Sequence, residues 1–310
     1  MGGILVVGTA MIDVIAPLIE GFKPGANYIV EVGSCYGGGG ANVAYYLAKL
    51  GDRVGLVSGL GTDPLGRAYE EYLRRLGVEL YLARGSRTGI LIGLTFNDGD
   101  RSFLADPGAN NEINGELVNK AIAEFDPDVV VVHGYMLSTQ HGRSTALRAA
   151  AAVSEYGFKL VFDPAYFNMN QEELKTALKI LESTYAVTPN EAEAQTLASI
   201  KDPVIAASKL AREYSITVYL KRGSRGATLV SERGIIAHAN PPTVKVVNSV
   251  GSGDTFTAVV AHGILRRQDP RVVLEQATHM ASKTATCKCP QCDILNPVQP
   301  PYIRSIGNPE

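Results

Sequence analysis

The residues best suited to chemistry gather in the stretch 244–258, where a β-branched run leads into glycines and an aspartate. The turn Gly251–Gly253 precedes Asp254, and apolar residues follow at helical spacing. This pattern predicts a strand over 244–247, a glycine turn and a helix. Backbone N–H groups at a helix N-terminus, together with the positive end of the helix dipole, favour a bound anion.

An aspartate at an anion site has two interpretations. Asp254 would repel a phosphate unless a proton or a cation stood between them, so a catalytic base that faces a hydroxyl nucleophile is one account. The other account is a helix cap, a role that aspartate fills well. The spacing alone leaves both interpretations open.

The rest of the chain alternates strand and helix patterns that would position this turn. The 310 residues, 45% of them apolar, are enough to bury a large core. Alternation of this kind predicts a mostly parallel sheet with helices on both faces, and ligands beyond the carboxyl ends of its strands. His133 and Asp163 fall at such ends, and a packed histidine is the commoner role for His133. Strand patterns cover 4–8, 129–133, 159–163 and 216–221, and helical patterns cover 67–76, 117–125, 144–156 and 271–286.

Composition excludes several classes of partner. A formal charge of −2 argues against a nucleic-acid partner. No apolar run approaches the length that spans a bilayer, and the first residues are typical of a strand rather than a signal peptide, so we expect a cytoplasmic protein.

Cysteine is unevenly distributed. Cys35 stands apart, whereas Cys287, Cys289 and Cys292 lie within six residues. A zinc site would need a fourth ligand at matching spacing, which the sequence lacks. A disulfide or free thiols are therefore favoured over zinc.

Three further segments add to the predicted fold. The four glycines of 37–40 lead into a helix that ends near Gly51, but the Gly-Lys-[Ser/Thr] ending of a phosphate loop is absent. The segments at about 14–35 and 86–104 carry short strand patterns that interrupt the α/β alternation, with a hairpin turn at 97–100.

Gly-Ser-Gly-Asp-Thr-Phe at 251–256 and four further segments resemble the signatures of the ribokinase-like, or PfkB, carbohydrate kinases. The resemblance implies one doubly wound α/β kinase domain over 1–310, with a small β-sheet lid built from the insertions at about 14–35 and 86–104. It also implies transfer of the γ-phosphoryl of ATP to a hydroxymethyl group of a small, ribose- or fructose-like sugar, with Mg²⁺. Homodimers formed through the lid are common in the family.

The same resemblance assigns the site residues. It gives catalysis to Asp254, with an anion hole at Gly251, Ser252 and Gly253. It gives substrate contacts to Asp13, Gly38, Gly39, Asn42 and Asp163, and ATP contacts to Lys221, Gly223, Ser224 and Gly226. It gives magnesium, held mostly through water, to Asn190 and Glu193, although acidic residues in a first helical turn are favourable regardless of function.

Departures from the family pattern bear on the substrate and the cofactor. Asn248 stands where potassium-activated members carry aspartate, which argues against a monovalent cation. Ribokinases often have lysine where Gly39 stands, which leaves the choice of sugar open. The cysteine-rich tail replaces the usual turn against the adenine.

Three alternatives remain. A nucleoside kinase would need an aromatic clamp, for which Tyr28, Tyr36 and Phe103 are candidates. A phosphosugar kinase would need Arg87 or Arg101 in the pocket. A non-catalytic sugar-binding relative is disfavoured, because a binding module has no use for a base at an anion hole.

Overall fold

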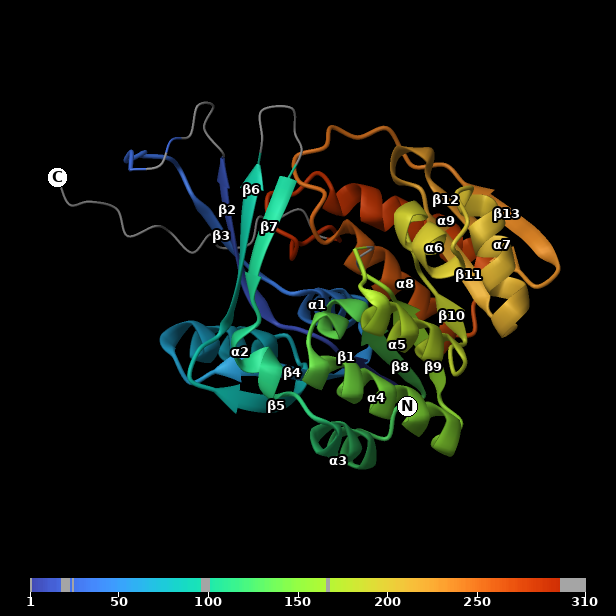
Figure 1. Ribbon diagram of the computed structural model, residues 1–310, viewed down its shortest axis with the longest axis horizontal. Coiled ribbons are helices and arrows are strands. Elements are labelled where there is room, and N and C mark those ends of the chain that lie inside the picture. Colours follow the sequence, from blue (N-terminus) through green and yellow to red (C-terminus); the bar gives the residue numbers. More distant parts are fainter. Residues whose placement is uncertain (1, 18–22, 24, 96–100, 166–167, 296–310) are drawn as a thin grey trace.

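The computed structural model describes residues 2–17, 23, 25–95, 101–165 and 168–295. Nine of the described strands form one large sheet, shown in Figure 1. In chain order they are β1 (Gly3–Val7), β4 (Arg53–Gly61), β5 (Glu79–Gly85), β8 (Val129–His133), β9 (Lys159–Asp163), β10 (Ala186–Val187), β11 (Thr217–Lys221), β12 (Ala227–Ser231) and β13 (Gly234–Ala239). Their spatial order is β13-β12-β11-β10-β9-β8-β1-β4-β5.

Pairing in the large sheet is parallel from β5 across to β11, whereas β12 and β13 add an antiparallel edge. The valines of β8, Val129–Val132, are buried throughout, as a strand covered on both faces requires. The mostly parallel α/β sheet predicted from the sequence is confirmed.

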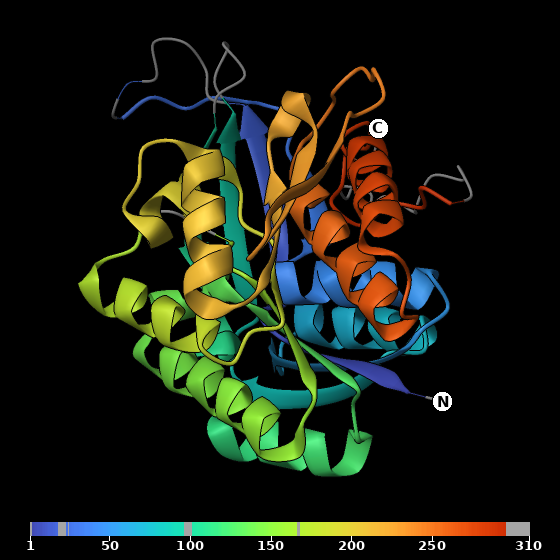
Figure 2. The same cartoon turned by 90° about the vertical axis from the view of Figure 1, so that its right-hand side faces the viewer.

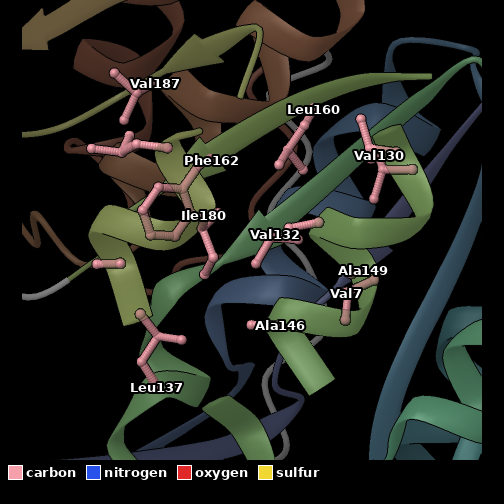
Figure 3. Close-up of a cluster of buried hydrophobic side chains, with 14 of the residues drawn as sticks. Val7, Val130, Val132, Leu137, Ala146, Ala149, Leu160, Phe162, Ile180 and Val187 are labelled. Carbon is pink, nitrogen blue, oxygen red and sulfur yellow. The ribbon is translucent and has the colours of Figure 1, made fainter. Parts of the chain in front are cut away.

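Helices cover both faces of this sheet, which Figure 2 shows as three layers. One face carries α3 (Gly115–Phe125), α4 (Gln140–Tyr156), α5 (Gln171–Leu181), α6 (Glu191–Ala198) and α7 (Pro203–Tyr214). The other carries α1 (Gly39–Lys49), α2 (Pro64–Arg75), α8 (Ser252–Leu265) and α9 (Pro270–Thr284). Figure 3 shows part of the first core, where Val132 and Phe162 of the sheet lie near Ala146 of α4 and Ile180 of α5. These two cores hold the strand ends in fixed positions.

A second, small sheet projects from the body of the molecule in Figure 1. Its strands are β2 (Met11–Pro17), β3 (Gly33–Gly37), β6 (Gly89–Thr95) and β7 (Arg101–Asp106), in the order β3-β2-β6-β7. The pairing of β2 with β6 is parallel and joins two distant segments, as predicted. Residues 28–32, which have a short alternating pattern, form no strand, and the turn expected at 97–100 lies outside the described residues.

Three 3₁₀ turns complete the described chain: η1 (Gly108–Glu112), η2 (Gly134–Ser138) and η3 (Gly223–Arg225). None of the helices in the described ranges is long and apolar enough to cross a membrane.

The strand predicted over 244–247 is wrong. This segment runs without a strand partner, and the amides of Val247 and Asn248 donate to the carbonyl of Ala285, at 2.8 and 3.1 Å, just beyond α9. Val246 is 60% exposed, so the β-branched run does not enter the core. The helices α5 and α7 and the edge strand β13 were not predicted from the sequence.

Two helices begin earlier than expected because a side chain caps them. Asp63 accepts a hydrogen bond from the amide of Gly66 and starts α2 at Pro64 rather than near 67. Thr139 accepts from the amide of Gly142 and starts α4 at Gln140 rather than near 144. Caps of this type satisfy amides that the first turn leaves free.

All four cysteines are paired. Cys35 of β3 is bonded to Cys289, 254 residues later, and Cys287 is bonded to Cys292. The disulfide interpretation is therefore the one that the structure shows, and no thiol is left to bind zinc. The first bond ties the small sheet to the loop after α9.

Candidate active site

A cavity of about 1080 Å³ lies at the carboxyl ends of β1, β8, β9 and β11, where helices α1 and α8 begin. Leu91 and Phe103 of the small sheet line it as well. Parallel sheets bind ligands at this edge, as the strand pattern predicted. Every residue that the sequence assigned to the site, apart from Gly251, lines this cavity. Gly251 lies directly beside it, at the start of α8.

Asp254 lies in the first turn of α8 and both of its carboxylate oxygens have partners. Oδ1 lies 3.1 Å from Nε2 of His133, and Oδ2 accepts a hydrogen bond of 2.7 Å from Nδ2 of Asn42. The turn before it needs glycine, because Gly251 has a φ of 84° and a Cβ there would lie 2.6 Å from Pro290. The sequence predicted the turn but not these partners.

Asp254 and His133 shift each other's pKa. Burial raises the pKa of Asp254, but the hydrogen bond and charge of His133, followed by the amide of Asn42, lower that pKa below its usual value overall. Burial lowers the pKa of His133, but the hydrogen bond and charge of Asp254 raise it above its usual value overall. The pairing therefore favours the ionised form of Asp254 and the protonated form of His133.

Asn42 is fixed from its other side by the C-terminal loop. Its Oδ1 accepts a hydrogen bond of 3.1 Å from Nε2 of Gln291, which also donates to the hydroxyl of Tyr69 at 2.6 Å. Tyr46 donates to the carbonyl of Pro290 at 2.7 Å. Sequence reasoning placed Asn42 at the sugar and missed Gln291, whose only signal was a break in the family pattern.

Asp13 is almost fully buried, and its Oδ1 has no hydrogen-bond partner among the described residues. The hydroxyl of Thr9, also on the cavity wall, is in the same situation. Burial, and then the charge of Asp254, raise the pKa of Asp13 to about 8. Glycine is required at position 37, because a Cβ there would lie 2.2 Å from the Asp13 carboxylate. Hydroxyl groups of a ligand could form hydrogen bonds with Oδ1 of Asp13 and with the hydroxyl of Thr9.

Lys221, at the end of β11, is held by Asp163, at the end of β9. Its Nζ donates to both carboxylate oxygens, at 3.1 and 3.2 Å, and Thr257 donates to the second of them at 2.5 Å. Burial lowers the pKa of Lys221, but the charges of Asp163 and Glu193 raise it above its usual value overall. The ammonium lies 3.4 Å from the point that a Cβ on Gly253 would occupy. Asp163 thus holds the ammonium of Lys221 beside the start of α8.

Asn190 and Glu193 form a capping box at the start of α6. The Glu193 carboxylate accepts hydrogen bonds from the backbone amide and the side-chain amide of Asn190, at 2.7 and 2.6 Å. Burial raises the pKa of Glu193 to about 7, although the charge of Lys221 opposes this. Both side chains line the cavity, and a hydrated Mg²⁺ needs only one or two such oxygens. The pair therefore fits the metal that the motif implies.

Gly223, Ser224 and Gly226 also line the cavity, around η3. Both glycines have positive φ, 56° and 78°, which lets the turn fold back at that wall. Asn248 donates from Nδ2 to the carbonyl of Lys288 at 2.8 Å, a bond that an ionised aspartate at this position could not make.

The residues named for the alternative substrates lie in different places. Phe103 lines the cavity, whereas Tyr36 is stacked on Tyr69 and Tyr72 with centroids 4.4 and 4.6 Å away. Tyr28 accepts a hydrogen bond from the Lys23 amide in an exposed segment. The remaining two candidates are arginines: Arg87, 71% exposed, pairs with Asp106 at 2.8 Å, and the side chain of Arg101 lies outside the described residues.

The family model of the pfkB family carbohydrate kinases matches residues 1–295. The chain belongs to this family. It is 26% identical to ribokinase of Mus musculus over 266 residues, which cover 83% of this chain and 80% of the relative. It is 27% identical to fructokinase of Klebsiella pneumoniae over 302 residues, which cover 92% and 94%. The solved structure of ribokinase from Thermotoga maritima superimposes with a TM-score of 0.80 at 25% identity, covering 94% of this chain and 95% of that one.

This pfkB family member is thus a carbohydrate kinase with the ribokinase-like fold that its motifs predicted. The match runs from residue 1 to residue 295 and therefore includes both sheets and all the residues that line the cavity.

Proposed function

We propose that this kinase transfers the γ-phosphoryl of ATP to a hydroxymethyl group of a small, unphosphorylated sugar, with Asp254 as the base. The observation that carries the proposal is the place of Asp254. It lines one cavity together with the unsatisfied oxygens of Asp13 and Thr9 and with the glycine turn of η3.

The residues of the cavity divide the reaction between them. Asp13 and Thr9 would bind hydroxyls of the sugar and present its hydroxymethyl group to Asp254. Asp254 takes the hydroxyl proton as the oxygen attacks the γ-phosphorus and the bond to ADP breaks. Charge on the transferred group is neutralised by the N-terminus of α8 and by Lys221.

The nucleotide would bind against Gly223, Ser224 and Gly226. Asn190 and Glu193 would hold a hydrated Mg²⁺, whose charge neutralises the phosphates of ATP. The buried hydroxyl of Ser252 has no hydrogen-bond partner among the described residues, so it is ready to donate to a phosphate oxygen. We propose no monovalent cation, since Asn248 uses its amide to bind the loop after α9.

The groups around the proposed acceptor favour an unphosphorylated substrate. Asp13 and Asp254 contribute carboxyl groups to the cavity, whereas Arg87, the arginine that could bind a phosphate ester, is turned to Asp106 at the surface. A nucleoside acceptor is the second candidate, and the aromatic ring of Phe103 in the cavity wall is the observation that favours it.

The test is ADP release with Mg-ATP and a panel of ribose, fructose, glucose, 2-keto-3-deoxygluconate, fructose 6-phosphate, adenosine and cytidine. We expect turnover on one unphosphorylated sugar and a loss of about 10²- to 10⁴-fold in Asp254→Asn. Turnover only on fructose 6-phosphate or only on a nucleoside would replace the proposed substrate class. Equal rates for the variant and the wild type would rule out Asp254 as the base.

We also propose that the small sheet acts as a lid and that two copies associate through it. Ile92 and Leu104 are cross-strand partners on β6 and β7, and both are exposed, on the face opposite to Phe103. Light scattering after gel filtration should give twice the mass of the chain, and Leu104→Glu should restore the single mass. The cytoplasmic location stays a prediction.

A further inference from the structure

His133 has a set of contacts that the reaction outlined above does not use. It ends β8, between β1 and β9, and its side chain is almost fully buried. Nε2 faces Asp254 at 3.1 Å, whereas Nδ1 has no hydrogen-bond partner among the described residues. Because one nitrogen of this buried ring contacts Asp254, the proposed base, His133 can affect the reaction as well as fill space in the core.

Gly39 creates the space that the imidazole occupies. A Cβ on Gly39 would lie 2.0 Å from Cε1 and 2.2 Å from Nε2 of His133. Glycine at position 39 is not explained by its backbone, which is the helical first residue of α1 and has no positive φ. The pair is therefore coupled, since any side chain at 39 would force the ring away from Asp254.

The carboxylate of Asp254 is consequently held from two directions. His133 binds Oδ1 from the end of β8, and Asn42 binds Oδ2 from α1. Each oxygen keeps a lone pair that can accept the proton of a substrate hydroxyl. With either partner missing, the carboxylate could rotate and the remaining contacts would no longer fix its direction.

We infer that His133 is a positioning residue for Asp254 and that it acts from the space left by Gly39. The inference rests on the proposed function of Asp254. It predicts that loss of the imidazole lowers kcat much more than it changes the KM for the acceptor, because His133 acts through Asp254 rather than on the sugar.

The inference also predicts a change in pH dependence. Without the imidazole, the two largest contributions that lower the pKa of Asp254 are lost, so this pKa should rise. The acidic limb of kcat/KM should then move to higher pH, since the base is protonated over a wider range. The other titratable groups that act on His133 or Asp254 stay in place in every variant: Asp13, Tyr46, Asp163, Glu193 and Lys221.

The activity test compares His133→Ala, His133→Gln, Gly39→Ala and the double variant His133→Ala/Gly39→Ala. We expect a fall in kcat of about 10- to 100-fold in His133→Ala, with the acidic limb shifted upward. Glutamine, which restores a donor without charge, should recover part of kcat but leave the acidic limb shifted. Gly39→Ala should reproduce the loss, and the double variant should add little to either single change.

A matched control is His262→Gln. His262 pairs with Asp52 at 2.7 Å outside the active-site cavity, so this change alters a comparable histidine–aspartate contact and should leave kcat within about twofold. Thermal melts of all variants separate loss of function from loss of fold. An unchanged kcat and acidic limb in folded His133→Ala would overturn the inference, and a raised KM at constant kcat would make His133 a sugar contact instead.

A spectroscopic readout keeps this result separate from the proposed function. Nitrogen-15 NMR of the imidazole should show His133 titrating above its ordinary pKa in the wild type and at lower pH in Asp254→Asn. If no acceptor is turned over but this shift is present, the proposed substrate fails while the pairing stands. The absence of the shift would overturn the pairing whatever the activity.

Discussion

Gln291 donates a hydrogen bond of 3.1 Å to Asn42 across 249 residues of sequence. Because Asn42 donates in turn to Asp254, this bond decides which way the Asn42 amide faces. If the amide turned over, its oxygen would face the carboxylate and repel it. The loop after α9 thus takes part in aligning the proposed base.

Replacing Gln291 by leucine should therefore reduce kcat by roughly tenfold, the effect of about one hydrogen bond to a charged group. Stability should fall as well, since the Tyr69 hydroxyl also loses its donor. Steady-state kinetics and a thermal melt measure the two effects. Gln268→Leu, at a half-buried glutamine outside this cavity whose Oε1 is buried, should leave kcat unchanged; an equal loss of kcat there would contradict the relay through Asn42.

Asp13→Asn should stabilise the fold at neutral pH and weaken acceptor binding. The pKa of Asp13 is raised from 3.8 to about 8 in the folded protein, so the folded state binds more protons between these values. Its contribution to the free energy of unfolding is then lost as pH rises, by at most about 1.4 kcal/mol per pH unit. Urea unfolding at pH 5, 6, 7 and 8 should show the free energy of unfolding of the variant rising relative to that of the wild type as the pH rises. A constant difference would mean that Asp13 is ionised throughout.

Lys221→Met should destabilise the fold by about 3–5 kcal/mol, because it leaves Asp163 buried without its cation. The double variant Lys221→Met/Asp163→Asn should recover much of that stability but none of the activity, since the cation beside α8 is still missing. Chemical denaturation and ADP release report the two quantities. Recovery of activity in the double variant would show that Lys221 is needed only to neutralise Asp163.

The two disulfides should differ in their effect on stability. Replacing both Cys35 and Cys289 by serine opens a loop of 254 residues, whereas replacing Cys287 and Cys292 opens one of 5. Chain entropy predicts losses of up to about 5 and about 2 kcal/mol respectively. Urea unfolding of both double variants, each with and without reductant, makes the comparison. A larger loss from the short loop would show that local geometry outweighs chain entropy.

Much of the fold was predictable because its signals are local. The buried runs at β8 and β9 and the glycine turn before Asp254 each reflect the backbone needs of a few neighbouring residues. The valine run at 244–247 failed for a physical reason, since β propensity acts only where a neighbouring strand offers hydrogen bonds. Its amides find the carbonyl of Ala285 instead.

The site was predicted in its residues but not in its contacts. Asn42 and Asp254 are 212 residues apart, and His133 and Asp254 are 121 apart. No local pattern reports which of the polar side chains at a sheet edge pair with each other and which face a ligand. Motifs placed Asn42 and Asp163 at the sugar, which stays a prediction, but they did not report that both also hold neighbouring side chains of the site.

The Cys35–Cys289 bond also determines whether proteolytic fragments of the chain separate. A protease that cuts once within the ring closed by this bond, for example in the extended segment 240–247, leaves two pieces joined through sulfur. On a denaturing gel without reductant the cut protein would retain its full mass, and only reduction would release the fragments. The bond thus closes residues 35–289 of the kinase into one covalent ring.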